Sequence, residues 1–382
     1  MHKDRERIVQ DSSKTHYPKC AGFLIVKLVS RIKKQIIVVN GKFLSQNITG
    51  VQRYAREIML ELDKIAADLP EIVLLTDKNA KDIPELKNIK VMPYGRLTGN
   101  PWEQISLPIY AIKNRAFCVS LCNMAPIVKP DAVVIHDISF RVNKSFFSKS
   151  FVLWYNFVFS TIIKKIKMIF TVSEFSKSEI CRYYNISKDK IVVTYNGWQH
   201  FERCEPTGNT LAKYGLVSGK FFFSMSSMAP NKNFMWIAKA AKNNPDTLFV
   251  ISGAINKKVF GDIFDFEIPQ NLRFLGYVRD EEAKELIAHC RAFLFPSYYE
   301  GFGIPPLEAL SVGAKVVVSD RSCMREIFGD HAYYISPDDA NINIDKLISQ
   351  PCLPPSDLLD KYSWKKSAAI LHDKLIELFY AQ

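Results

Sequence analysis

Residues 292–313 read AFLFPSYYEGFGIPPLEALSVG and combine the three parts of a strand–loop–helix unit. The first residues are apolar and favour a buried strand, and the residues up to Gly303 form a loop. Pro305 and Pro306 then open a helix that stops at Gly313. Proline is accepted in a first helical turn because the N–H groups there have no partner inside the helix. The glycines let the backbone approach a ligand closely, and the free N–H groups at the helix start favour a phosphate.

Short apolar runs of this kind recur along the chain and alternate with helical patterns. The predicted strands are QIIVVNGKFL, EIVLLTD, AVVIHD, KMIFTVS and KIVVTYNG in the first half, and KFFFSMSS, DTLFVISG, NLRFLGYV, AFLFPS and AKVVVSD in the second. Such alternation is typical of parallel sheets with crossover helices. We therefore predict an α/β protein with two Rossmann-like, doubly wound domains facing across a cleft, where ligands bind beyond the carboxyl ends of the strands.

The predicted domain boundaries follow from breaks in this pattern. Residues 1–35 form a basic N-terminal extension that ends in AGFLIVKLVSRIKK. The first Rossmann-like domain covers 36–205, and the second covers 206–360 after the polar break ERCEPTG. A helix with an apolar face, over 361–382, is expected to cross back to the first domain. A length of 382 residues suits two domains.

Composition excludes several classes of protein. Apolar residues make up 48% and charged residues 24%, which is ordinary for a globular chain and excludes a disordered or fibrous one. No apolar stretch approaches the roughly 18 residues that a membrane-spanning helix needs. The eight cysteines include no C-x-x-C pair, so we interpret even the closest two, Cys118 and Cys122, as buried reduced thiols rather than a metal or redox pair. A cytoplasmic protein is expected.

The net charge of +12 lies entirely in the first half of the chain. Residues 1–205 carry 32 Lys+Arg and 19 Asp+Glu, or +13, whereas residues 206–382 carry 19 and 20, or −1. A one-sided basic surface favours an anionic partner, which can be a membrane, a phosphorylated substrate or a nucleic acid. No nucleic acid is expected, because no zinc-finger, RNA-binding or helix-turn-helix signature accompanies the charge. The candidate membrane segments are AGFLIVKLVSRIKK and SFFSKSFVLWYNFVFSTIIKKIK.

Two carboxylates, Glu300 and Glu308, flank the glycine-rich turn. Eight positions at the rise of a helix place them roughly 12 Å apart. That exceeds the roughly 5–9.5 Å between the paired carboxylates of glycoside hydrolases. The pair is therefore better suited to gripping two ends of one ligand than to hydrolysing a single bond.

Seven segments, in this order, resemble one known family. They are ITGVQRYAREI, PWEQISLP, VVIHDISF, TVSEFSKSEI, NLRFLGYVRDEE, FPSYYEGFGIPPLEAL and FGDHAYYISPDD, and they span about residues 36–345. Together they resemble the retaining GT-B glycosyltransferases with an E-x7-E motif (family 4, or glycosyl transferases group 1), which use nucleotide-sugar donors. They are most similar to the branch that builds bacterial O-antigens, capsules and exopolysaccharides, many of whose members bear the name mannosyltransferase.

The resemblance implies that the second domain, 206–360, is the nucleotide-sugar-binding one and that the first, 36–205, lies on the acceptor side. The donor site would lie around Glu300 and Glu308. Glu300 would contact hydroxyls of the donor sugar, and Glu308 would accept hydrogen bonds from the ribose hydroxyls. Tyr277 and Val278 would lie against the nucleotide base, although core packing is an equally good interpretation of these two. The backbone amides that would hold the sugar and the diphosphate are those of Gly301, Phe302, Gly303 and Ile304.

The resemblance also implies contributions from the first domain. His136 would contact the donor sugar near its reacting carbon, with Asp137 orienting the imidazole ring. The loop that contains Thr49 and Gly50, with Arg53 one turn into the following helix, would offer amides and a cation close to the diphosphate or the acceptor. Glu174, by contrast, is interpreted as the first residue of a helix rather than as a catalytic group.

One departure from the family pattern concerns the diphosphate. Family members commonly have P-R-K-N after the first strand of the second domain, but this chain has Pro230, Asn231, Lys232 and Asn233. Lys232 alone would then offset charge on the departing phosphate. The chain contains no D-x-D motif, which a transferase that relies on Mg²⁺ would use. Metal-independent catalysis without a cofactor is therefore expected.

The combined prediction is a retaining hexosyltransferase of lipopolysaccharide or capsule biosynthesis. The donor would be GDP-mannose, and the acceptor a glycan linked to a lipid pyrophosphate. The enzyme would lie peripherally on the anionic inner face of the cytoplasmic membrane. Two alternatives stay open: the same chemistry with a UDP-sugar, and a nucleotide-sugar-binding protein without catalysis, which the missing arginine favours.

Overall fold

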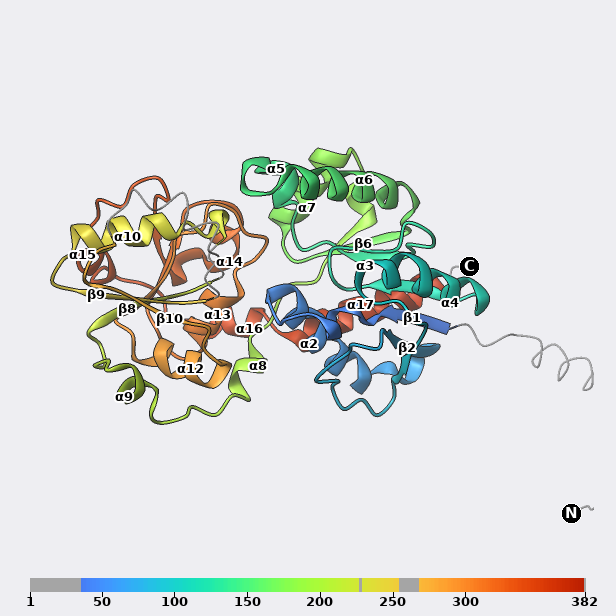
Figure 1. Ribbon diagram of the computed structural model, residues 1–382, viewed down its shortest axis with the longest axis horizontal. Helices are drawn as coiled ribbons and strands as arrows, with labels where there is room; N and C mark the ends of the chain where they lie inside the picture. The colour runs from blue at the N-terminus through green and yellow to red at the C-terminus, as the bar shows by residue number, and fades with distance from the viewer. Residues whose placement is uncertain (1–35, 227–228, 254–267, 381–382) are drawn as a thin grey trace, which may run out of the picture. The chain divides into compact units, whose positions relative to one another are not determined.

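The computed structural model of the protein describes residues 36–226, 229–253 and 268–380 (Figure 1). The predicted N-terminal extension lies outside these residues. The described chain contains two parallel β-sheets, each with helices packed against it (Figure 1).

The first sheet has seven strands, all parallel, in the order β3-β2-β1-β4-β5-β6-β7. Strand order reverses between β1 and β4, as in a doubly wound fold. The strands are β1 (Ile36–Asn40), β2 (Glu71–Thr76), β3 (Lys90–Pro93), β4 (Phe117–Ser120), β5 (Ala132–Val134), β6 (Met168–Thr171) and β7 (Ile191–Val193).

The second sheet has six parallel strands in the order β10-β9-β8-β11-β12-β13, with the same reversal between β8 and β11. The strands are β8 (Phe221–Met225), β9 (Leu248–Ser252), β10 (Leu272–Gly276), β11 (Ala292–Phe295), β12 (Val316–Ser319) and β13 (Tyr333–Ile335). The predicted fold of two Rossmann-like α/β domains is therefore confirmed.

All ten predicted strands are present, because each apolar run supplies residues for a buried strand. Three short strands, β3, β4 and β13, were not predicted. Length alone does not explain this, because β5, β6, β7, β11 and β12 are equally short and were predicted. β3 is a partly buried edge strand that ends at Pro93, so it lacks a buried apolar run.

Helices connect the strands. They are α2 (Gly50–Lys64), α3 (Gly99–Pro101), α4 (Leu107–Lys113), α5 (Ser139–Val142), α6 (Lys149–Lys165), α7 (Glu174–Tyr184), α8 (Gln199–Glu202), α9 (Thr210–Tyr214), α10 (Phe234–Asn243), α12 (Asp280–His289), α13 (Ile304–Ser311), α14 (Met324–Phe328), α15 (Ile344–Ile348), α16 (Ser356–Lys361) and α17 (Trp364–Tyr380). Residues Trp102–Ser106, within the PWEQISLP segment, form a π-helix before α4.

Helix α13 has the boundaries that its sequence predicts. Gly303 is its N-cap residue, with φ of 100°, a conformation that glycine adopts without strain. Pro305 follows in the first turn. The helix ends at Ser311, and Gly313 with φ of 79° reverses the chain.

The last helix, α17, packs against α2 of the first-sheet domain. Its apolar face is buried, and Phe379 meets Phe117 of β4 with ring centroids 5.5 Å apart. At its start, Trp364 meets Tyr54 of α2 at 5.9 Å. The final helix therefore contacts elements of residues 36–205 through its apolar face.

Candidate functional site

The carboxyl edge of the second sheet brings two predicted site residues together. Lys232 ends a short 3₁₀ helix that follows β8, and Glu300 lies in the loop that follows β11. These two strands are neighbours at the point where strand order reverses, which is where ligands of doubly wound sheets bind.

Lys232 and Glu300 form an ion pair at this edge. The Lys232 Nζ donates to both carboxylate oxygens of Glu300, at 2.6 and 2.9 Å. The ammonium group also lies 5.6 Å from the centroid of the Phe295 ring, within the range of a cation–π contact. Both side chains are largely buried, so the two charges compensate one another in the ligand-free protein.

The neighbours of Lys232 hold its loop against the Glu300 loop. The Asn231 carbonyl accepts from the Tyr298 amide at 2.8 Å. The buried amide of Asn233 donates to the carbonyls of Pro296, at 3.1 Å, and Pro337, at 2.8 Å. Asn233 has φ of 54°, a left-handed conformation that asparagine tolerates better than most residues. Asn231 and Asn233 therefore act on the site through its backbone.

Gly301 lies directly against the backbone of His136. A Cβ atom added at Gly301 would lie 3.1 Å from the His136 carbonyl carbon and closer still to its oxygen, so no larger residue fits. Ser173 Oγ, at the start of α7, donates to the Gly301 carbonyl at 2.7 Å. Ser176 Oγ donates to the His136 carbonyl at 3.0 Å and also reaches the Gly301 carbonyl at 3.4 Å. Two serines thus tie the E-x7-E segment to the carboxyl edge of the first sheet.

A carboxylate strengthens the same contact. Glu326 of α14 accepts from the backbone amides of Glu174 at 2.8 Å and Phe175 at 2.7 Å. It therefore satisfies two free N–H groups at the start of α7, where a negative charge is favoured. Glu174 is the first residue of α7, which confirms its interpretation as a helix-start residue.

His136 follows β5 and is a neutral, buried histidine. Burial lowers the pKa of its imidazole to about 4. The ring Nε2 lies 3.0 Å from the Leu121 carbonyl, and the ring meets Tyr54 edge-on at 4.9 Å. The expectation that Asp137 orients the ring is wrong, because the Asp137 carboxylate accepts from the Ser139 amide while the Leu121 carbonyl holds the imidazole.

Glu308 is buried in the second turn of α13 and is bonded to an unpredicted histidine. His200 Nε2 lies 2.7 Å from Glu308 Oε1. Arg53 of α2 is ion-paired with Asp280 at the start of α12. Burial lowers the pKa of Arg53, but the carboxylates of Asp280 and Glu308 outweigh that effect and raise it. Arg53 thus brings a cation into the surroundings of Glu308.

The predicted loop before α2 also lies close to the start of α13. Thr49 is the N-cap of α2 and forms a capping box with Gln52. A Cβ atom added at the next residue, Gly50, would lie 3.5 Å from the Ile304 side chain at the start of α13. The N-termini of α2 and α13 therefore lie close together, and helix N-termini favour anions.

The two residues predicted beside the base differ in exposure. Tyr277 is 74% exposed, whereas Val278 is buried. An exposed aromatic side chain is available to stack on a base, and Val278 has the burial expected of core packing.

Among the described residues, no three His, Cys, Asp or Glu side chains are grouped so that they could hold a metal ion. Cys118 and Cys122 are free thiols, and burial raises the pKa of both.

Sequence reasoning missed several residues of the site. His200, Ser173, Ser176 and Glu326 all contact the predicted residues, yet none belongs to a spacing that marks a site. The only available signal was their position beside a motif, since TVSEFSKSEI contains both serines and FGDHAYYISPDD begins just after Glu326.

The part of the chain that contains this site resembles a known protein family. Residues 211–361 match the family Glycosyl transferases group 1. This range contains Lys232, Glu300, Glu308 and the whole second sheet. It does not include the first sheet.

Two relatives extend the similarity. The chain is 32% identical over 220 residues to the O-antigen chain mannosyltransferase B of Escherichia coli, covering 54% of this chain and 57% of the relative. It is 28% identical over 235 residues to the O-antigen chain mannosyltransferase RfbU of Salmonella typhimurium, covering 59% and 62%. The chain thus spans about six tenths of the length of these relatives.

Solved structures share the whole fold. A sucrose-phosphate synthase from Thermosynechococcus elongatus has a TM-score of 0.70 at 15% identity, over 91% of this chain and all of that one. HepE of Anabaena, in complex with UDP and glucose, has a TM-score of 0.65 at 13% identity, over 90% and 99%. The fold is therefore that of the GT-B glycosyltransferases.

Proposed function

We propose that the protein is a retaining, metal-independent GT-B glycosyltransferase. It moves a hexose from a nucleotide sugar to a lipid-linked glycan in the synthesis of a bacterial surface polysaccharide. The observation that carries this proposal is the Lys232–Glu300 pair beside the N-terminus of α13, with Glu308 one turn further, inside the range that matches the family.

The geometry suits a ligand with a diphosphate at its centre. The amides at the start of α13 and the ammonium of Lys232 favour the negative charge of the diphosphate. Glu300, on one side, is then free to accept hydrogen bonds from sugar hydroxyls. Glu308, on the other side, accepts from the ribose hydroxyls.

These same groups stabilise the charge that develops as the bond breaks. The bond between the sugar and the diphosphate lengthens, the sugar becomes oxocarbenium-like, and the leaving oxygen gains charge that Lys232 offsets. The acceptor hydroxyl attacks the same face of the sugar, and the leaving phosphate takes its proton. The step therefore needs no side-chain nucleophile, and positive potential is supplied without a metal.

GDP-mannose is the proposed donor. Its support is that both O-antigen relatives bear the name mannosyltransferase. A UDP-sugar is the alternative, favoured by the UDP and glucose in the HepE structure. A nucleotide-sugar-binding protein without catalysis is the alternative of another class, and the Asn231 that replaces the family's arginine favours it.

One experiment separates these possibilities. The protein is incubated with GDP-mannose and with UDP-hexoses, and both thermal stabilisation and release of nucleoside diphosphate are measured. We expect GDP-mannose to stabilise the protein and to be consumed when a lipid-linked acceptor is present. Stabilisation without release of nucleoside diphosphate under any condition would indicate a binding protein. Stabilisation by UDP-sugars alone would show that the donor is a UDP-sugar and not GDP-mannose.

A membrane surface is proposed as a second partner, and helix α6 supports it. One face of α6 packs into the core through Val158, Phe159, Ile162 and Ile163. The opposite face exposes apolar side chains, with Leu153 73% and Phe157 57% exposed. No helix among residues 36–226, 229–253 and 268–380 has both the length and the apolar character to span a bilayer.

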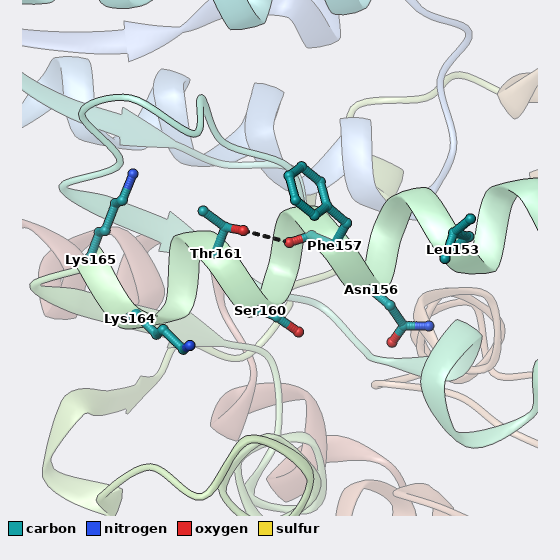
Figure 2. A pocket seen from close by; sticks show the side chains of 7 residues that line it. All are labelled: Leu153, Asn156, Phe157, Ser160, Thr161, Lys164 and Lys165. Carbon is teal, nitrogen blue, oxygen red and sulfur yellow. Dashed lines mark hydrogen bonds between the residues drawn. The ribbon is translucent and has the colours of Figure 1, made fainter.

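Figure 2 shows this exposed face. Its residues recur every three or four positions and border an open hollow of about 420 Å³: Leu153, Asn156, Phe157, Ser160, Thr161, Lys164 and Lys165. Because all of them belong to one helix, the hollow is an open surface rather than an enclosed pocket. Apolar side chains followed by lysines match a helix that lies on an anionic membrane, where each cation adds about 1 kcal/mol near the surface.

Sedimentation with vesicles tests this proposal. The protein should sediment with anionic vesicles at low salt, be released by high salt, and bind neutral vesicles poorly. Replacing Leu153 and Phe157 by serine should weaken attachment, whereas Val217→Ser, at a 65% exposed valine before β8, should not. Deletion of residues 1–34 tests the other candidate segment. Equal partitioning to neutral and anionic vesicles would contradict the electrostatic contribution.

A further inference from the structure

Glu308 is one end of a chain of three buried side chains. His200 Nε2 lies 2.7 Å from Glu308 Oε1, and His200 Nδ1 lies 3.0 Å from Trp364 Nε1. His200 belongs to α8, on the segment that leads from the first sheet to the second, and Trp364 begins α17. All three side chains are buried.

The indole fixes the tautomer of the histidine. The Nε1–H group of tryptophan can only donate a hydrogen bond, so His200 Nδ1 must accept it. In a neutral imidazole the other nitrogen then carries the proton. His200 Nε2–H therefore donates to Glu308, and the neutral ring holds the carboxylate without cancelling its charge.

The start of α17 is itself fixed from the same segment. Gln199, the neighbour of His200, accepts from the Trp364 backbone amide at 3.2 Å. Its amide group donates to the Tyr362 carbonyl at 3.1 Å. The backbone around Trp364 thus cannot move away from His200 without breaking the two hydrogen bonds to Gln199.

On the carboxylate, Oε1 is committed to His200. Within the described residues, no hydrogen bond reaches Oε2. A carboxylate held at one oxygen by a rigid donor presents its second oxygen in a fixed direction, which is what recognition of a hydroxyl pair needs.

We propose that His200 is a positioning residue of the donor site. With its tautomer set by Trp364, it holds Glu308 at Oε1 and directs Oε2 toward the ribose hydroxyls. This inference rests on the proposed function, because it takes Glu308 as the residue that binds the ribose.

The test compares two ligands that differ only in those hydroxyls. Binding of the donor's nucleoside diphosphate, GDP or UDP, and of its 2′,3′-dideoxy form is measured by calorimetry. The wild-type protein should bind the dideoxy form about ten- to a hundredfold more weakly, the loss expected for hydrogen bonds to a charged group. His200→Leu should bind the normal nucleotide more weakly and lose most of this discrimination.

Conservative variants separate positioning from folding. The amide of His200→Gln retains one donor and one acceptor, so this variant should recover discrimination. Trp364→Phe removes the indole N–H together with part of the buried ring, so its folding would be checked, and it should give an intermediate value. Spectra of ¹⁵N-labelled histidine should show the His200 proton on Nε2 in the wild type.

Three results would overturn the inference. They are full discrimination in a folded His200→Leu, no loss of discrimination in Trp364→Phe where His200→Leu misfolds, and a His200 proton on Nδ1. A wild-type protein that binds neither nucleotide would instead overturn the proposed function, so the two failures are distinguishable.

Discussion

Because Gly301 packs directly against the His136 backbone, the substitution Gly301→Ala, which adds one methyl group, tests whether this contact is needed. Gly301 does not have a positive φ, so Gly301→Ala introduces no backbone strain of its own. The new Cβ would lie 3.1 Å from the His136 carbonyl carbon and 3.2 Å from Asp137 Cβ. The nearest atoms are backbone atoms, which cannot rotate away as a flexible side chain would.

The expected loss of stability can be estimated from these contacts. Overpacking of this kind costs about 1–3 kcal/mol. If the loops separate, the hydrogen bonds from Ser173 and Ser176 to the Gly301 carbonyl weaken as well, at about 1 kcal/mol each. Alanine also lowers the conformational entropy of the unfolded chain, which offsets about 0.4–1 kcal/mol of this loss of stability. We therefore expect Gly301→Ala to destabilise the protein by about 2–4 kcal/mol.

The expected effect on activity is larger. A displacement of about 1 Å in a positioned loop can lower turnover about a hundredfold. Denaturant unfolding and donor turnover would be measured together, with Gly50→Ala as the matched control for stability. Its Cβ would meet Ile304 at 3.5 Å, an ordinary contact, so its unfolding midpoint should not change appreciably. A Gly301→Ala protein with wild-type stability and turnover would show that the two loops do not touch in solution.

Three further variants test the assigned roles. Lys232→Ala should lower turnover about a hundredfold and affect donor affinity less, since Lys232 faces charge that grows as the bond breaks, and lost affinity with unchanged turnover would refute this role. Activity should also survive a chelator, and strict Mg²⁺ dependence would contradict the metal-free proposal. Glu308→Ala should weaken donor binding about ten- to a hundredfold, so an unchanged Michaelis constant and turnover would remove it from the site. His136 has a pKa of about 4 when folded and about 6.5 when unfolded, so protonation of the unfolded state should progressively remove about 3 kcal/mol of stability as pH falls from 6.5 to 4. His136→Gln should abolish that part of the pH dependence, as measured by denaturant unfolding at several pH values.

The sequence predicted the fold well because the buried strands of a parallel sheet are apolar runs that can be recognised individually. It singled out Glu300, Glu308 and Lys232 as candidates because the family-like motif around each is local. What it could not predict is which of these residues meet. Lys232 and Glu300 are 68 positions apart, and they pair because β8 and β11 are neighbours in the sheet.

The same limit explains the missed histidine. His200 and Glu308 are 108 positions apart, and Trp364 is 164 positions from His200. Their contacts depend on how the segment after β7 and the start of α17 pack against α13. A lone histidine in a sequence gives no sign of such partners. Even a neighbouring carboxylate is an unreliable sign, because Asp137, next to His136, accepts from the Ser139 amide instead.

The two glutamates of the E-x7-E motif are held in physically different ways. Glu300 is paired with a cation that a diphosphate also attracts, whereas Glu308 is held by a neutral imidazole that does not compete for the ligand. A bound diphosphate would draw Lys232 away from Glu300 and release that carboxylate for the sugar hydroxyls, while Glu308 needs no such release. Recognition of the sugar should therefore depend on the diphosphate. A free hexose should not bind alone, even at high concentration, but should bind weakly when the nucleoside diphosphate is present, which calorimetry with and without the nucleotide can measure. Equal hexose binding in both cases would mean that the Lys232–Glu300 pair does not govern access to Glu300.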